Sequence, residues 1–257
     1  MADLGVGDLV DGLRCLKVQP GGFIEVHSSL SSFGWVAGGA DTIITALLQA
    51  VGQDGSVVMP AAQASRGVPL TPEEWQRGLT WKVRVLDPDD LTTPTFQGRV
   101  ADRFRTWPGV VRDSYSAWGA HADDFCHGLA PFVEAGGRCV LLGVGLDRAS
   151  CLHTADHRVQ IPADIKQLQV PPADVQRDYP SDTWWIGYDA RRLGREVKTS
   201  HLLQAAADDL DLLTRTKIGA ANCMSCEAKP LVEVDVRLRQ ERPYQMHGLL
   251  PPTSTFP

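Results

Sequence analysis

Two residues three apart in the chain, His153 and Asp156, have the types and the spacing that acid–base chemistry needs. They follow the apolar run RCVLLGVG at 138–145, and open α/β sheets place ligand sites at the ends of such strands. On a helix, a spacing of three puts both side chains on one face, where a carboxylate orients an imidazole and stabilises its charge. A histidine held in this way is a general base near neutral pH, with a helix-capping or surface contact as the alternative.

A third residue, His157, opens a metal-binding alternative for the same stretch. In HTADH the two histidines stand at positions i and i+4, but the glutamate that follows the first histidine in H-E-x-x-H peptidases is missing. A metal-dependent hydrolase using His153 and His157 would take its third ligand from elsewhere. The chain lacks the G-x-S-x-G of serine hydrolases. Cys223 and Cys226 form a C-x-x-C without a second pair at zinc-ribbon spacing.

The stretch VHSSLSSFGWVAGG at 26–39 has the composition of an anion-binding loop. It begins at the end of the apolar strand FIEV, continues through hydroxyls and glycines, and leads into a helical pattern near Asp41. Strand, loop and helix in this order bring several backbone N–H groups and a helix N-terminus to one place, which suits an anionic ligand. The spacing matches neither the dinucleotide G-x-G-x-x-G nor the P-loop, and a plain strand-to-helix turn is the alternative.

The elements that must position these residues follow from periodicity and turn residues, and they predict an α/β fold. Apolar runs predict strands over 23–26, 56–60 and 138–145. Helical spacing predicts helices over 5–16, 42–51, 98–107 and 200–213. Asp41 is the expected N-cap of the second of these, and a further helix is expected to start with Ser150 as its N-cap. The segment LVEVDVRLR alternates like an exposed-face strand, although it also fits the continuation of a helix.

Length and charge place the chain among ordinary globular proteins. Its 257 residues suffice for one α/β domain over 1–257, with proline-rich, irregular excursions at 61–97 and 160–195. The formal charge is −6, from 25 Lys+Arg and 31 Asp+Glu, which argues against nucleic acid and for a cationic partner. Neither a long apolar run nor a signal-peptide pattern occurs, so a cytoplasmic protein without a membrane partner is expected. The oligomeric state stays open, a homodimer included.

Taken together, several stretches resemble the antibiotic N-acetyltransferase family, that is, the aminoglycoside 3-N-acetyltransferases and their relatives. They occur in the family's order and span most of the chain: VHSSLSSFGWVAGGADTIITAL, VVMP, Asp87-Pro88 followed by Thr93-Pro94, GRVADRFRTWPGVVRDS, LLGVG, LHTAD and KIGAANCMS. The resemblance implies a single-domain, layered α/β fold of the antibiotic N-acetyltransferase type, unrelated to the common GNAT acetyltransferases. In that reading the two excursions lie on the substrate side.

The activity implied by this resemblance is acetyl transfer from acetyl-CoA to an amine of an aminoglycoside antibiotic, which confers resistance and needs no metal. His153 matches the family's active-site histidine, and Asp156 takes the place of the glutamate in its H-x-x-E motif. The resemblance places acetyl-CoA along the first loop and beside a later serine, on His27, Ser28, Ser29, Leu30, Ser31, Phe33, Gly34, Val36, Gly38, Gly39 and Ser116. A non-catalytic relative that binds CoA or a sugar is the other alternative.

The chain departs from the family's pattern around the substrate. Tyr115-Ser116-Ala117 replaces a His-Pro pair and a serine, the segment before LLGVG is short, and Ser65-Arg66 stands where the family often has an acid. The acceptor is therefore either the 3-amino group of an aminoglycoside or the 2′-amine of kasugamycin. A cationic acceptor favours an acidic lining, for which Asp87, Asp89 and Asp182 are candidates, and Trp184 offers a ring for stacking on a sugar.

Overall fold

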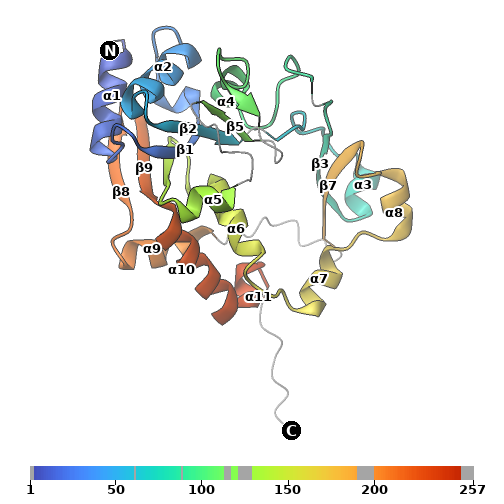
Figure 1. The fold of residues 1–257 in the computed structure, drawn as a ribbon. Helices are drawn as coiled ribbons and strands as arrows, with labels where there is room; N and C mark the ends of the chain where they lie inside the picture. Colours follow the sequence, from blue (N-terminus) through green and yellow to red (C-terminus); the bar gives the residue numbers. More distant parts are fainter. Residues whose placement is uncertain are drawn as a thin grey trace.

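A computed structural model describes residues 3–60, 62–87, 89–112, 117–120, 129–189 and 200–249. Its centre is a mixed seven-stranded sheet with the strand order β4-β5-β2-β1-β6-β9-β8 (Figure 1). The strands are β1 Phe23–Ser28, β2 Ser56–Pro60, β4 Val111–Arg112, β5 Ala117–Ala120, β6 Arg138–Leu142, β8 Thr214–Ile218 and β9 Ala221–Glu227. Strand β1 is central and pairs in parallel with β2 and β6, whereas the outer strands pair antiparallel.

Helices cover both faces of this sheet. On one face lie α1 Val6–Cys15, α2 Ala40–Val51 and α4 Arg99–Phe104, and on the other lie α5 Leu129–Glu134, α6 His153–Asp156, α9 Ser200–Asp209 and α10 Ala228–Glu241. Short 3-10 turns occur at η1 Leu30–Phe33, η2 Leu146–Arg148 and η3 Ser150–Leu152, and α11 Pro243–Met246 follows α10. This arrangement confirms the predicted layered α/β class.

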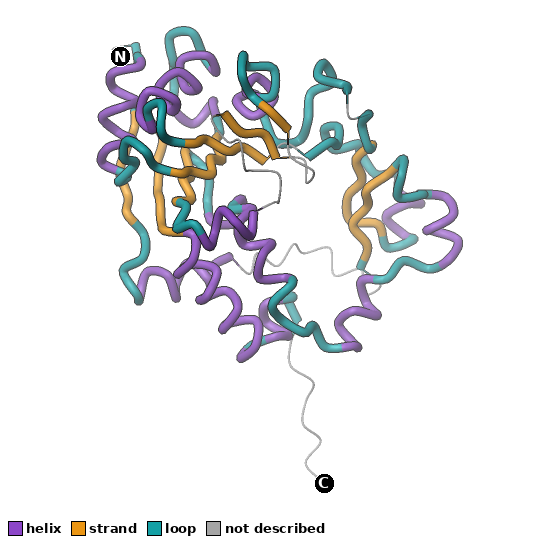
Figure 2. Tube along the Cα trace, viewed as in Figure 1, coloured by secondary structure: helices purple, strands orange, loops and turns teal. Residues whose placement is uncertain are grey.

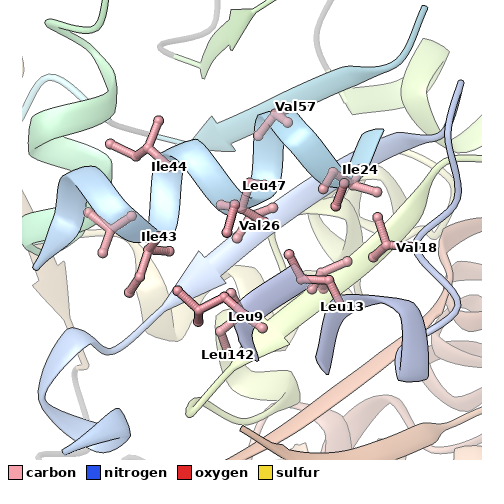
Figure 3. Packing of buried hydrophobic residues seen from close by; sticks show 14 of the residues in the cluster. Leu9, Leu13, Val18, Ile24, Val26, Ile43, Ile44, Leu47, Val57 and Leu142 are labelled. Carbon is pink, nitrogen blue, oxygen red and sulfur yellow. The ribbon is translucent and has the colours of Figure 1, made fainter. Parts of the chain in front are cut away.

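Two hydrophobic cores, one on each face, hold the layers together. Figure 3 shows the first, where Leu9 and Leu13 of α1 and Leu47 of α2 pack onto Ile24 and Val26 of β1. Each of these five side chains is at most 3% exposed, and burial of one such side chain contributes about 1.5–3 kcal/mol. Because side chains alternate along a strand, Glu25 and His27 of β1 face the second core instead.

The second core explains why LVEVDVRLR is helical rather than extended. The buried residues of α10 recur every three or four positions, which is the spacing of one helix face: Ala228, Leu231, Val232, Val234, Asp235 and Leu238. The alternation of valine with charged residues within this segment is therefore incidental to its packing. Of the two predictions for the segment, the helix is confirmed and the strand is wrong.

The start of α2 also differs from the prediction. Its N-cap is Gly39, with φ at 60°, and Asp41 lies in the first helical turn, where its carboxylate accepts a hydrogen bond from Arg103 Nε at 2.7 Å. A glycine takes the capping position because the backbone there has a positive φ, which a residue with a Cβ rarely adopts. An acid in the first turn still suits the helix dipole.

The two excursions, predicted as irregular, form a small unit of their own. Strand β3 Leu79–Arg84 pairs antiparallel with β7 Trp184–Tyr188, and helices α3 Pro72–Gln76 and α8 Ala173–Asp178 flank the pair. Helix α7 Ala163–Gln169 leads from α6 toward this unit, which stands apart from the large sheet (Figure 2). Within the described residues, no helix has both the length and the apolar character that crossing a membrane requires.

Candidate active site

The predicted acid–base pair is formed in the structure. His153 and Asp156 are the first and last residues of α6, and His153 Nδ1 lies 3.2 Å from Asp156 Oδ2. The His153 side chain is 77% exposed, so a ligand can reach the ring. The sequence predicts Ser150 as a helix N-cap, but Ser150 is the first residue of the 3-10 turn η3, and Leu152 is the N-cap of α6.

Each partner shifts the pKa of the other. The hydrogen bond from Asp156 raises the pKa of His153 above its ordinary value, against the opposing effect of desolvation. Partial burial raises the pKa of Asp156, but the His153 hydrogen bond and the Arg239 charge outweigh it, so the net shift is downward. Asp156 is therefore ionised at neutral pH, and its carboxylate stabilises the imidazolium form that His153 takes after it accepts a proton.

The segment before His153 is fixed to the central strand by three hydrogen bonds. The main-chain N–H of Ser150 donates to His27 Nε2 at 3.1 Å, and the N–H of Cys151 donates to both carboxylate oxygens of Glu25 at 3.2 Å. His27 Nε2 also lies 2.9 Å from Glu25 Oε1. These contacts anchor η3 and α6 at the carboxyl end of β1, which is the edge of the sheet where the first loop begins.

Glu25 is a functional-site candidate that the sequence analysis missed. It is fully buried at 0% exposure, and burying a carboxyl group is costly unless hydrogen bonds compensate it. In the sequence, the feature that could have indicated this role is a charged residue within the otherwise apolar predicted strand FIEV. Its role as an anchor for η3 depends on Cys151, which is 126 positions away in the chain.

A cavity of about 950 Å³ opens at the carboxyl end of β1. Its lining includes the residues of the first loop that the resemblance assigned to acetyl-CoA, namely His27, Ser28, Ser29, Leu30, Ser31, Gly34, Val36, Gly38 and Gly39. We call these nine residues the cradle. Phe33 was assigned with them, but its side chain is 2% exposed, packs in the first hydrophobic core and does not line the cavity. Ser116 lies outside the described residues.

The backbone of the cradle depends on glycines. Gly34 and Gly38 have φ angles of 82° and 79°, in the left-handed region that favours glycine. Gly143, at the end of β6, lies so close to Ser32 that a Cβ there would stand 1.7 Å from the Ser32 hydroxyl. The glycine at 143 therefore lets the end of β6 pack directly beneath the loop.

The lining of the cavity also contains two arginines that the sequence analysis did not assign. Arg99, the first residue of α4, and Arg148 of η2 both line the cavity, together with Trp35, Phe96, Gln97, Gly98 and Val144. Two guanidinium groups, backbone N–H groups and serine hydroxyls form a suitable environment for phosphate oxygens. Arg99 stood within the quoted segment GRVADRFRTW, but nothing in that segment indicated which of its arginines faces a ligand.

The residues predicted to bind the acceptor do not line this cavity. Trp184 of β7 lines a second cavity of about 510 Å³, where the Lys82 ammonium and the Arg84 guanidinium lie 5.6 and 5.1 Å from its ring centre. Asp87 accepts a hydrogen bond from the Asp89 N–H at 2.8 Å, which is a local turn contact. Asp182 is exposed beside Thr183, within hydrogen-bond distance of its hydroxyl.

The metal alternative receives no geometric support from His153 and His157. Among the described residues, the side chains close enough to share an ion are Glu25, Cys139 and Cys151, which are all buried, and neither histidine belongs to that group. Cys223 and Cys226 face opposite sides of β9, since Cys223 packs in the first core and Cys226 in the second. A strand separates a C-x-x-C pair in this way because its side chains alternate.

Solved structures share this fold. The aminoglycoside acetyltransferase AAC(3)-IVa, as the apoenzyme, superimposes with a TM-score of 0.71 at 22% identity, covering 98% of this chain and 94% of that one. AAC-IIIb, solved as a binary complex with CoASH, gives a TM-score of 0.68 at 23% identity, covering 94% and 98%. The layered arrangement of the type expected from the resemblance is thereby confirmed.

Sequence comparisons agree with the fold. The family model described as aminoglycoside 3-N-acetyltransferase matches residues 26–239. The aminoglycoside N(3)-acetyltransferase IX of Micromonospora chalcea is 32% identical over 256 residues, covering 87% of this chain and 88% of that protein. The SPbeta prophage-derived aminoglycoside N(3′)-acetyltransferase-like protein YokD of Bacillus subtilis (strain 168) is 30% identical over 241 residues, covering 84% and 85%. The chain therefore belongs to the aminoglycoside 3-N-acetyltransferase family.

Proposed function

We propose that this protein transfers the acetyl group of acetyl-CoA to an amine of an aminoglycoside antibiotic, with His153 as the general base, and that this reaction confers resistance. The observation that carries the proposal is the attachment of the His153 segment to His27, a residue of the cradle, through the Ser150 hydrogen bond of 3.1 Å. A base and an anion-binding cavity are thus built on the same strand end. Family membership supplies the class of reaction.

The acid–base step follows from the orientation of the His153 ring. Because Nδ1 faces the Asp156 carboxylate, Nδ1 carries the proton and donates it, which leaves the lone pair of Nε2 to accept one. An acceptor amine is protonated at neutral pH and must lose a proton before its nitrogen attacks a thioester carbonyl. As the new C–N bond forms and the C–S bond breaks, the nitrogen loses a second proton. Of the two protons, one passes from His153 to the CoA sulfur and the other goes to solvent, so the products are an amide, a free thiol and a released proton.

We assign acetyl-CoA to the cavity of the cradle. Ser28, Ser29 and Ser31 offer hydroxyl donors to its polar arm, and Arg99 and Arg148 offer positive charge to its phosphates. The relative solved with CoASH has the same fold, which supports this assignment without placing any atom of the ligand here. Asp156 has the orienting role, and no metal is required for the steps assigned to these residues.

The acceptor side lies, in this proposal, toward the β3–β7 unit. The chain leaves that unit through Phe96, Gln97 and Gly98, which line the cavity, and the segment that follows His153 leads into it through α7. Relatives named as N(3)-acetyltransferases favour a 3-amino group as the acceptor. The altered segments at Ser65-Arg66 and Tyr115-Ser116-Ala117 make the 2′-amine of kasugamycin the second acceptor to test.

A thiol-release assay tests the proposed function. The protein is incubated with acetyl-CoA and each of gentamicin, apramycin, paromomycin and kasugamycin, and free CoA thiol is followed over time. We expect release that depends on the aminoglycoside, and NMR of the product locates the acetyl group on the 3-amine or, for kasugamycin, on the 2′-amine. Binding of CoA with no thiol release across the panel would instead identify a non-catalytic relative and contradict the proposal.

A further inference from the structure

Asp156 has a second partner on a helix that is distant in sequence. While its Oδ2 faces His153 at 3.2 Å, its Oδ1 accepts a hydrogen bond from Arg239 Nη1 of α10 at 2.5 Å. Arg239 in turn donates through Nε to Asp235 Oδ2 at 2.8 Å, one turn earlier on α10. The four side chains form one continuous line from the exposed imidazole to the interior of the second core.

Asp235 is the unusual member of this line. Its side chain is 2% exposed and occupies a core position on the buried face of α10, where an apolar residue would be expected. A carboxylate at such a position is costly unless a charged partner is held against it in good geometry. Desolvation raises the pKa of Asp235, and the Arg239 charge opposes that effect. The hydrogen bond that Asp235 accepts from Arg239 therefore explains why a carboxylate occupies this core position.

Arginine is the side chain that can make both contacts at once. Its rigid guanidinium directs the Nε and Nη1 protons to two different carboxylates, whereas a lysine ammonium is a single point charge on a flexible stem. Asp235 and Asp156 therefore hold the guanidinium between them, and Arg239 is only 20% exposed. The rotation of the Asp156 carboxylate is in turn limited by a partner on each of its oxygens.

We propose that Arg239, held by Asp235, is a positioning residue that fixes the Asp156 carboxylate against His153 and so sets the orientation of the base. The expected effect of Arg239 on turnover rests on the proposed function. The expected effect of Arg239 on the pKa of His153 does not depend on any substrate. Arg239 acts through Asp156 and is not placed in contact with the reacting atoms.

The same arrangement sets the electrostatic surroundings of His153. Asp156 of α6 and Glu25 of β1 favour the protonated ring, and Arg239 of α10 opposes it. Asp235 neutralises part of the Arg239 charge. On α5, which contacts α6, Glu134 is engaged by Arg158 and Lys229 at 2.7 and 2.9 Å. Removing the Arg239 charge therefore removes a positive charge that opposes protonation of His153.

The test uses the whole protein with three variants. Arg239→Gln removes both the charge and the clamp, Arg239→Lys keeps the charge but loses the two-sided geometry, and Arg237→Gln is the control. Arg237 is exposed on the same helix, so its loss removes an equal charge away from Asp156. The pKa of His153 is measured by NMR titration of its imidazole in the free protein, with assignment by comparison with His153→Gln, and kcat and KM are measured for each variant.

We expect Arg239→Gln to raise the pKa of His153 by about half a unit to one unit, since a nearby positive charge is lost. Asp156 stays beside His153 in this variant but is no longer held in one rotation, so we also expect kcat to fall about tenfold as the base loses its fixed orientation, with KM for acetyl-CoA within about twofold. Arg239→Lys should restore the pKa but only part of kcat. Arg237→Gln should change neither quantity. In an Asp156→Asn background, Arg239→Gln should lower kcat much less than it does in the wild type.

Unchanged His153 pKa and kcat in folded Arg239→Gln would overturn the inference, while thiol release by the wild type would leave the proposed function standing. Conversely, a protein that releases no thiol would contradict the proposed function, and the NMR titration would still decide the inference. If Arg239→Gln does not fold, Arg239→Lys decides the inference. A wild-type kcat in Arg239→Lys would contradict a role for the two-sided clamp. A reduced kcat with an unchanged pKa of His153 would support that role.

Discussion

The main-chain N–H of Ser150 donates a hydrogen bond to the Nε2 atom of His27 at 3.1 Å. His27 is part of the cradle, and Ser150 stands three residues before His153. One hydrogen bond therefore connects the two halves of the proposed reaction centre. Because β1 is the central strand and is buried on both faces, it provides a rigid base for both halves.

We predict that the buried Glu25 is needed to keep this connection in place. Glu25→Leu would leave the Cys151 N–H without its acceptor, and a buried unsatisfied donor costs about 1–3 kcal/mol. Glu25→Gln is the matched control, because its amide oxygen can still accept that hydrogen bond. Urea unfolding should show the larger loss of unfolding free energy for Glu25→Leu, accompanied by a lower kcat. Equal stability of the two variants would contradict this role.

A second prediction concerns the pH dependence of turnover. His153 acts as a base when it is neutral, and the Asp156 hydrogen bond raises its pKa, so kcat should fall as the pH drops through that raised value. Asp156→Asn removes the negative charge that stabilises the imidazolium ring. The acid limb of the profile should then move to lower pH, while the plateau falls about tenfold as orientation is lost. A limb that stays in place or moves to higher pH would show that Asp156 does not act on His153.

A third prediction tests the positive wall of the cavity. Each charged hydrogen bond to a phosphate is worth about 1.5–3 kcal/mol, so Arg148→Gln and Arg99→Gln should each raise KM for acetyl-CoA about tenfold or more. Turnover at saturation should stay close to the wild-type value, because neither residue takes part in proton transfer. Arg237→Gln again serves as the charge-matched control. KM values unaffected by both substitutions would place the CoA phosphates elsewhere.

The parts of the fold and site that were predictable from the sequence are those set by local patterns. Strands β1 and β6 are apolar runs, and helices α1 and α4 show helical spacing between turn residues. The contact between His153 and Asp156 follows from a separation of three on a helix. The cradle residues were identified through the resemblance, and most of them meet at one cavity.

The parts that were missed depend on contacts between distant segments. The pairing of β3 with β7 joins two excursions, and Arg77 reaches Asp174 from 97 positions away. The anchoring of Cys151 by Glu25 and the clamping of Asp156 by Arg239 are likewise tertiary contacts. Local propensity contains no information about such partners. In α10 the alternating pattern also competed with the helical one, and burial against the sheet decided between them.

The rate of CoA thiol release by His153→Ala tests the central claim most directly. Under saturating acetyl-CoA and the best aminoglycoside acceptor, loss of the base should lower kcat by about 10²–10⁴-fold. His157→Ala, an exposed histidine four residues later, is the matched control and should keep wild-type turnover. Binding of CoA, measured by calorimetry, should be the same for the wild type and both variants. Near-wild-type turnover by a folded His153→Ala protein would contradict the assignment of His153 as the base.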